Sequence, residues 1–222
     1  MSNEANSNRS ASVIADAIRD EILNDSFRQG SPLREVSLAA RFSVSRRTIR
    51  EALLALTADG LVTHKHNQGA SVRKYERQDV RDLYRVRRLL ESEAARCAPT
   101  VSSDLLDRID EACDALELAA QQGFTSVELA KADAAFHGSV IALLESPRFS
   151  EFYASIAQQV VRVITLAQDT DVALQRDVTT IVAEHRAIRD ALVHRDGWEA
   201  QRLITDHVDR HEQNLLAGLD AH

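Results

Sequence analysis

Glycine and proline are scarce in this chain, and their positions constrain its fold more than any other feature. The 222 residues include only 7 Gly and 3 Pro, whereas residues that favour helices, such as Ala, Leu, Arg and Glu, are abundant. Between the breaks, apolar residues recur at helical spacing, as in Ile14, Ile18 and Ile22. The chain is therefore predicted to be mostly α-helical, with helices that end near glycine or proline.

The first third of the chain combines helices with two short strand-like runs. Breaks at Gly30 and Gly60 and a turn at Ser43 separate three helical segments, and Ser45 is a suitable N-cap for the third. Three helices followed by a hairpin are typical of a winged helix-turn-helix. We place this domain at residues 11–74, after a disordered polar tail (1–10) and before a linker (75–78). The predicted helices cover residues 12–24, 34–41 and 45–59, and the predicted strands cover 61–63 and 70–72.

The remainder of the chain, residues 79–222, reads as helix throughout. Its helical pattern is interrupted at Pro99, Gly123, Pro147, around Thr170 and at Gly197. Short breaks between helices of this length predict an antiparallel α-helical bundle of about six helices. We expect it to be the effector-binding and dimerisation domain. Its predicted helices cover residues 79–98, 103–121, 126–144, 148–168, 175–194 and 197–218.

The charge of the chain is divided unevenly between these two parts. Residues 1–74 hold 11 Lys or Arg against 8 Asp or Glu, a net charge of +3, and the remainder holds 16 against 26, a net charge of −10. The overall charge of −7 therefore belongs to the helical bundle. A basic N-terminal domain on an acidic body suits a protein in which only that domain meets phosphates.

Several classes of protein are disfavoured by the composition. The longest apolar runs are a few residues, so no transmembrane helix is expected. The polar N-terminus lacks the apolar core of a signal peptide. Cys97 and Cys113 lie in helical patterns and suggest no disulfide framework. These features together predict a cytoplasmic protein without membrane contact.

Positively charged side chains gather at the start of the third predicted helix. Arg46 and Arg47 lie in its first turn, where they oppose the helix dipole, and Arg50 lies one turn beyond Arg46 on the same face. This arrangement adds nothing to the stability of the helix. An external anion would offset the unfavourable positive charge. The N-terminus of a recognition helix in the major groove meets such anions. We therefore expect Arg46 and Arg50 to contact guanine edges or phosphates.

The neighbouring residues supply further candidates for DNA contact. Ser45, Arg47 and Thr48 are expected to contact backbone phosphates. At the tip of the wing, Lys65 and His66, with Gly69 at its end, are expected in or near the minor groove. For any single arginine, a solvated helix face is the alternative interpretation. Three arginines within five residues, after a turn and before an apolar helix and a hairpin, favour DNA.

The same stretch resembles the GntR family of bacterial regulators. The resemblance is carried by residues 33–39, 44–53 and 60–62, which read Leu-Arg-Glu-Val-Ser-Leu-Ala, Val-Ser-Arg-Arg-Thr-Ile-Arg-Glu-Ala-Leu and Gly-Leu-Val. The family usually shows Val-Ser-Arg-Thr-Pro-Val-Arg-Glu-Ala-Leu, so Arg47 and Thr48 depart from its pattern. Some members also carry an arginine at the position of Val36. The resemblance implies a winged DNA-binding domain.

In the predicted bundle, one carboxylate and three imidazoles are placed to share a metal ion. Asp133 and His137 lie four residues apart on one helix, so both side chains can point at one ion. His185 lies eleven residues before Asp196 and His207 eleven residues after it, so the two rings should lie at the same height of an antiparallel hairpin. An Asp/His₃ set suits Zn²⁺, Ni²⁺ or Mn²⁺. A histidine alone on an apolar helix face is more often a hydrogen-bonded core residue than a ligand, and His211, one turn beyond His207, could compete for the role.

Residues 79–218 are also similar to the FCD domain of the FadR-like branch of that family. The matching pieces include residues 82–87, 133–137, 184–188 and His207. The resemblance implies that Asp133, His137, His185 and His207 are the metal ligands and that the effector is a small organic acid. Arg87 could face the same cavity as a carboxylate-binding residue. It could instead pair with Glu91, four residues along the helix.

These patterns together predict a non-enzymatic, dimeric bacterial transcription regulator. We expect it to bind a double-stranded DNA operator as a homodimer, because one recognition helix reads too few base pairs. A small carboxylate bound at or near the metal would control DNA affinity, as in a repressor or an activator. Two alternatives stay open: a metal-dependent hydrolase that uses the Asp/His₃ site, and a regulator with a purely structural metal.

Overall fold

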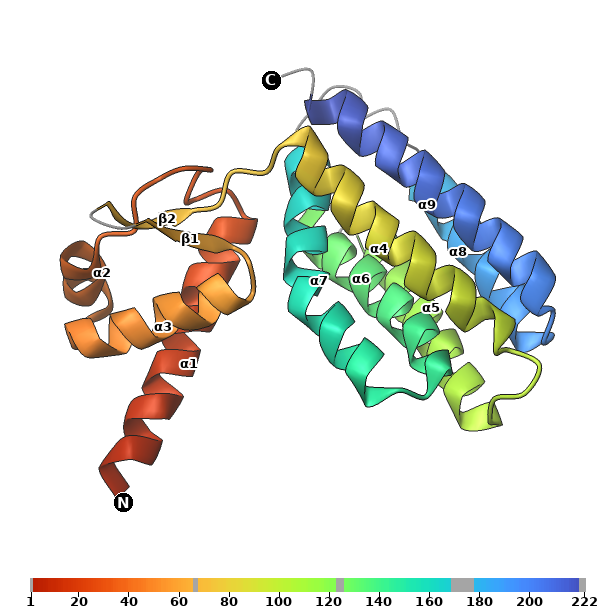
Figure 1. Cartoon of the computed structure of the whole chain (residues 1–222), viewed down its shortest axis with the longest axis horizontal. Coiled ribbons are helices and arrows are strands. Elements are labelled where there is room, and N and C mark those ends of the chain that lie inside the picture. The colour runs from red at the N-terminus through yellow and green to blue at the C-terminus, as the bar shows by residue number, and fades with distance from the viewer. Residues whose placement is uncertain (1, 66–67, 123–125, 169–177, 220–222) are drawn as a thin grey trace. The chain divides into compact units, whose positions relative to one another are not determined.

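The computed structural model describes residues 2–65, 68–122, 126–168 and 178–219 (Figure 1). The chain divides into two compact units, Met1–Tyr75 and Glu76–His222. The first is a winged helix-turn-helix and the second is a helical bundle, so the predicted mostly α fold is confirmed. The breaks predicted at Gly123 and around Thr170 lie outside the described residues.

The first unit contains three helices and a two-stranded antiparallel hairpin. In the hairpin Val62 pairs with Val72 and Lys65 with Gly69. The core beneath it is apolar and fully buried, with Ile18, Ile49 and Leu56 at its centre. The elements are α1 (Ser2–Leu23), α2 (Glu35–Phe42), α3 (Arg46–Ala58), β1 (Val62–Lys65) and β2 (Gly69–Val72).

Local signals define the ends of the recognition helix α3. The Ser45 side chain accepts a hydrogen bond from the backbone N–H of Thr48, at 3.1 Å, and so satisfies one of the N–H groups that a helix leaves without an internal partner. Just after the helix, Gly60 adopts a φ of +73°, a conformation that glycine reaches without strain. The predicted N-cap and C-terminal glycine therefore position α3 as expected.

The boundaries of the first unit differ from those predicted. Helix α1 begins at Ser2, where a disordered tail over residues 1–10 was expected. No glycine or proline precedes Gly30, so nothing in the sequence stops the helix from extending towards the N-terminus. The predicted linker is also shorter, because Tyr75 is buried and donates from its hydroxyl to the carbonyl of Gly60, while the next helix already begins at Arg77.

The second unit is a bundle in which α4 packs along α9 and also contacts α6 and α7 (Figure 1). Proline and glycine fall at its helix boundaries as predicted: Pro147 begins α7, and Gly197 begins α9. A Cβ atom at Gly197 would lie 2.9 Å from the carbonyl oxygen of Ala95, so the close approach of α4 requires glycine there. The helices are α4 (Arg77–Arg96), α5 (Ser103–Gln121), α6 (Ser126–Ile141), α7 (Pro147–Gln168), α8 (Val178–Val193) and α9 (Gly197–Leu219), with a short 3₁₀ helix at Ala142–Leu144.

Within the described residues, no helix combines the length and the apolar character needed to cross a membrane.

Candidate metal centre and nucleic-acid interface

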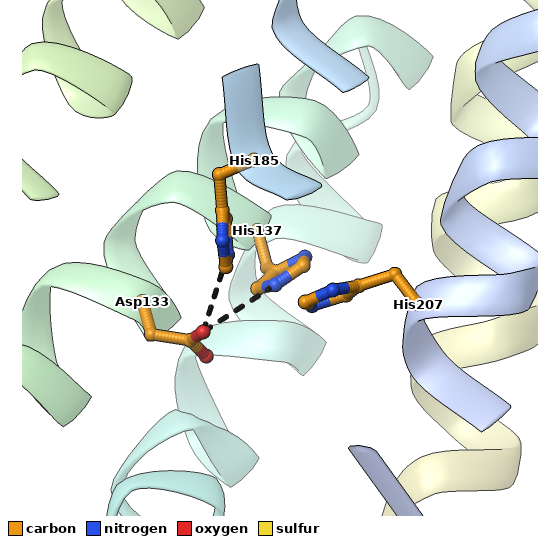
Figure 2. Close-up of side chains that lie close together, drawn as sticks. All are labelled: Asp133, His137, His185 and His207. Atoms are coloured by element: carbon orange, nitrogen blue, oxygen red, sulfur yellow. Dashed lines mark ion pairs between the residues drawn. The ribbon is translucent and has the colours of Figure 1, made fainter. Parts of the chain in front are cut away.

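Four buried side chains from three helices converge in the second unit (Figure 2). Asp133 and His137 come from α6, His185 from α8 and His207 from α9. One potential ligand atom from each residue lies within 4.8 Å of those of the others. The Nε2 atoms of His185 and His137 lie 3.2 and 3.8 Å from Oδ1 of Asp133. The four residues that the helical spacing and the hairpin argument singled out therefore lie together in the structure.

The outer nitrogen of each imidazole is held by an acceptor. Nδ1 of His137 donates to Glu91 at 2.7 Å, Nδ1 of His207 donates to Glu184 at 2.8 Å, and Nδ1 of His185 donates to the carbonyl oxygen four residues earlier at 2.8 Å. These bonds leave the lone pair on Nε2 of each ring. Although all three Nε2 atoms are buried, none makes a hydrogen bond of good geometry among the described residues, and the 3.2 Å approach of His185 to Oδ1 of Asp133 is an ion-pair contact only. This is the arrangement of metal-ligating histidines, in which the second nitrogen donates to a carboxylate or carbonyl.

The protonation state of the cluster also suits a cation. Burial lowers the pKa of His207 to about 3, and burial together with the charge of Arg87 lowers the pKa of His137. Although burial raises the pKa of Asp133, the attraction of His137 and His185 outweighs it and the pKa falls below its usual range. Three imidazoles beside one ionised carboxylate present four donor groups of the type that Zn²⁺, Ni²⁺ or Mn²⁺ binds.

The space beside the cluster is small in this conformation. A cavity of about 20 Å³ touches Asp133, His207 and His211. A volume of this order holds about one water molecule. His211 does not join the four-residue cluster; its Nδ1 lies 3.2 Å from the hydroxyl of Tyr84. The cluster therefore has room for an ion.

Arg87 lies beside the cluster and is fully buried. Its Nε donates to Glu91 at 2.8 Å, and its guanidinium stacks on the ring of Tyr84 at 4.9 Å. Within the described part of the chain, its two terminal nitrogens have no hydrogen-bond partner. Arg87 thus pairs with Glu91, as one interpretation predicted, and retains two buried donors of the kind that binds a carboxylate. Glu91 joins Arg87 to His137.

In the first unit, the recognition arginines are already partnered. Glu35 of α2 accepts two hydrogen bonds from Arg50, at 3.0 and 2.9 Å, and one from Arg46 at 3.3 Å. Nε of Arg47 lies 2.9 Å from Glu51. The expectation that this cluster receives no local compensation was therefore wrong, because carboxylates on α2 and α3 balance it. All three guanidinium groups remain largely exposed.

The remaining residues predicted to contact DNA differ in their exposure. Lys65 and Gly69 are exposed at the hairpin, as expected for a wing, whereas His66 lies outside the described residues. Thr48 is only 7% exposed, and its hydroxyl lies 2.9 Å from that of Ser45. The Ser45 hydroxyl caps α3, and the Thr48 hydroxyl is hydrogen-bonded to it. Thr48 lies beneath the surface that faces outward.

Three acidic residues make contacts in these sites that the sequence analysis did not predict: Glu35, Glu91 and Glu184. Each contacts a partner on another helix. A weak signal existed for Glu184, because it lies 23 residues before His207 and therefore near the same height of the α8–α9 hairpin. Glu91 and His137 are 46 residues apart and belong to helices whose register no local pattern determines.

A winged helix-turn-helix joined to a helical bundle with a buried Asp/His₃ cluster defines a class of protein, the DNA-binding transcription regulators. Comparison with known proteins agrees. Residues 10–72 match the gntR family of bacterial regulatory proteins, and residues 82–210 match the FCD domain. The chain belongs to the GntR family, in the branch that carries a C-terminal FCD domain.

Individual relatives match both units at once. The Nta operon transcriptional regulator of Aminobacter aminovorans is 30% identical over 86% of this chain and 87% of its own. The transcriptional repressor RspR of Escherichia coli (strain K12) is 25% identical over 89% of this chain and 85% of its own. A crystal structure of a GntR transcriptional regulator from Rhodococcus sp. RHA1 superposes with a TM-score of 0.80 at 27% identity, covering 93% of this chain and 97% of that one. These relatives are regulators and not enzymes, so the hydrolase alternative has no support.

Proposed function

We propose that the chain is a transcription regulator whose C-terminal unit binds a divalent metal ion through Asp133, His137, His185 and His207. One observation carries this proposal: three buried imidazoles present unpartnered Nε2 atoms to one carboxylate, while each Nδ1 is held from outside. Leaving buried polar atoms without partners is costly. An ion of the Zn²⁺, Ni²⁺ or Mn²⁺ type satisfies all of them.

Metal content and thermal stability test this site. Protein purified without chelator is expected to hold about one ion per chain, and chelation is expected to lower its melting temperature, because a ligand at 100 times its Kd stabilises by about 2.7 kcal/mol. Asp133→Asn and His207→Ala should abolish both effects. His194→Ala is the matched control, since this exposed histidine bonds to the carbonyl of Asp190 and is not one of the four clustered residues. Wild-type protein that neither retains nor takes up any of the three metals would contradict the proposal.

The effector of this regulator is proposed to be a small organic acid. A bound divalent ion would supply a positive charge with open coordination positions, and the terminal nitrogens of Arg87 would supply two donors beside it. A carboxylate is the group that matches both. The small cavity at the cluster implies that binding separates helices around Asp133 and Ile164, which line it. Effector binding is thus expected to change the conformation of the bundle.

Titration of metal-loaded protein with small mono- and dicarboxylates tests this assignment by calorimetry. Binding should be lost when the metal is removed. A second candidate is favoured by the same small cavity, namely a structural metal with regulation through protein contacts alone. Metal-dependent stability without binding of any acid in the panel would support that candidate and contradict ours.

For DNA recognition, we propose that Arg46 and Arg50 contact bases and that Ser45 and Arg47 contact phosphates. The exposure of the three guanidinium groups at the N-terminus of α3 supports this division. Lys65, His66 and Gly69 of the wing are proposed to reach the minor groove or its phosphates. Thr48 is proposed to act through its hydrogen bond to Ser45, the N-cap residue of α3.

The regulator is proposed to act as a homodimer on a two-fold operator, because a single recognition helix reads few base pairs. Light scattering and a shift assay on duplexes selected from a random-sequence pool test this. The selected sites should be inverted repeats, and the complex should contain two chains. Selection of unrepeated sites by a monomer would contradict the proposal.

A further inference from the structure

A single carboxylate on the DNA-facing side of the first unit holds two of the proposed base-reading arginines. Glu35 begins α2 and lies beside α3, where its Oε1 accepts from Nε of Arg50 at 3.0 Å and its Oε2 accepts from Nη2 of Arg50 at 2.9 Å. Oε2 also accepts from Arg46 at 3.3 Å. All three residues line one groove of about 830 Å³ between α2, α3 and the wing. The Glu35 side chain is 23% exposed, while those of Arg50 and Arg46 are 61% and 62% exposed.

The geometry of the Arg50–Glu35 pair orients one edge of the guanidinium outward. The carboxylate occupies the edge formed by Nε and Nη2. The opposite edge, to which each terminal nitrogen contributes one N–H, points away from Glu35. Two parallel N–H groups on one edge match the O6 and N7 acceptors of guanine. A flexible exposed arginine becomes a directed donor pair in this way, because one edge is already bound.

The charge of Glu35 has a separate consequence. The hydrogen bond from Arg50 is the main cause that lowers the pKa of this carboxyl group, so Glu35 stays ionised at neutral pH. A negative charge on a surface that approaches phosphates weakens binding to every DNA sequence, since non-specific affinity depends on charge neutralisation. Because Glu35 lies among Arg46, Arg47 and Arg50, it lowers the affinity for all DNA. Only DNA that offers Arg50 a base partner regains that affinity.

We infer that Glu35 is a specificity-determining positioning residue, which directs Arg50 towards a guanine edge and suppresses binding to non-operator DNA. This inference rests on the proposed base contacts of Arg46 and Arg50. It goes beyond them because the discrimination between operator and random DNA is assigned to Glu35, a residue whose negative charge is repelled by DNA phosphates. Glu35→Gln should bind random DNA more tightly by about two- to fivefold, the effect of one surface charge. The ratio of operator to random-sequence affinity should fall by about fivefold or more, since correct bidentate contacts discriminate at least that strongly.

Fluorescence anisotropy with two probes tests the inference on the full-length protein. The probes are the tightest-binding duplex selected from a random library and the unselected random-sequence duplex pool, each titrated over a range of KCl concentrations. For Glu35→Gln, the dependence of log affinity on log salt should steepen by about 0.9 per charge for the random pool. Glu35→Asp retains the charge but shortens the side chain, so it should keep the weak random binding and lose part of the discrimination.

A matched control removes an equal charge elsewhere in the same unit. Glu21 pairs with Arg41 at 2.8 Å and does not contact Arg46 or Arg50, so Glu21→Gln should leave the affinity ratio unchanged. Circular dichroism confirms that each variant is folded. If Glu35→Gln weakens binding to both probes by the same factor, Glu35 is merely structural and the inference is overturned. An unchanged ratio overturns it as well.

Arg50→Ala separates this inference from the proposed function. If this variant loses affinity for the selected duplex far more than for the random pool, the base contact of Arg50 stands whatever Glu35 does. If it weakens both probes equally, Arg50 contacts phosphate. The proposed division of roles then fails, and the inference about Glu35 fails with it.

Discussion

Replacement of Glu91 by glutamine isolates the energy of a buried ion pair next to the proposed metal site. Glu91 and Arg87 are both fully buried on α4, 2.8 Å apart. Burial raises the pKa of Glu91, but Arg87 and His137 lower it to about 2, so the native residue is a carboxylate. Glutamine keeps the shape but has a single acceptor oxygen. If that oxygen accepts from Nδ1 of His137, the amide NH2 group faces the Nε–H of Arg87, so the substitution removes the charge and the hydrogen bond from Arg87.

The expected cost is large because the guanidinium loses its counter-charge in a buried position. Removing one partner of a buried pair destabilises by about 3–5 kcal/mol. In a unit of this size, about 2–4 °C of melting temperature is lost per kcal/mol, so Glu91→Gln should lower the transition of the metal-free protein by about 6–20 °C. The sign of the pH dependence follows from the lowered pKa. The wild-type advantage is complete above the ordinary value of 4.5 and is lost as pH falls through it towards 2.

The double variant Arg87→Met/Glu91→Gln distinguishes an unpaired charge from general damage to the core. It leaves no buried charge in the pair and fills a similar volume. Its stability should therefore lie closer to wild type than that of Glu91→Gln. Thermal and urea unfolding followed by circular dichroism, in chelator at pH 7, measure the cycle. Glu91→Gln as stable as wild type, or a double variant less stable than Glu91→Gln, would refute this reasoning.

Three further outcomes can be measured independently. Ser45→Ala removes the N-cap of α3 and should cost about 1 kcal/mol of stability in the first unit, measured by urea unfolding; no change would mean that water replaces the cap. Gly197→Ala places a Cβ 2.9 Å from a carbonyl oxygen of α4 and should cost about 1–3 kcal/mol, which an unchanged melting temperature would contradict. Burial raises the pKa of the Cys113 thiol to about 11, so iodoacetamide at pH 7.5 should alkylate Cys97 and spare Cys113 in peptide mass spectra.

Features encoded locally were predictable from the sequence. The Ser45 cap, the helix start at Pro147 and the turn at Gly197 each depend on a few neighbouring residues, and the structure confirms all three. The grouping of the four residues of the proposed metal site was also predictable, because i,i+4 spacing and the symmetry of a hairpin are simple geometry. His185 and His207 lie with ring centroids 4.7 Å apart, at the same height of α8 and α9 as expected.

Partners on separate helices were not predictable. Glu91 reaches His137 only because α4 packs against α6 in one particular register. The same holds for Glu35, whose position relative to α3 depends on how the first unit packs. The extent of α1 was missed for the opposite reason. A polar stretch without glycine or proline fits a disordered tail and a helix equally well, and composition does not separate the two.

The two Arg–Glu pairs, one exposed and one buried, have different consequences for ligand binding. Arg50 and Glu35 are joined at the surface, where water screens their attraction, so the pair adds little to stability and its main effect is to orient the edge of Arg50 that faces away from Glu35. Arg87 and Glu91 are joined in the core, where neither charge can be solvated, so the pair persists whatever else binds. A ligand carboxylate at Arg87 must therefore use the terminal nitrogens and leave the bond from Nε to Glu91 in place. Glu91 then stays in place and keeps its own hydrogen bond with Nδ1 of His137. Binding of an acid should therefore strengthen metal binding and not displace the ion.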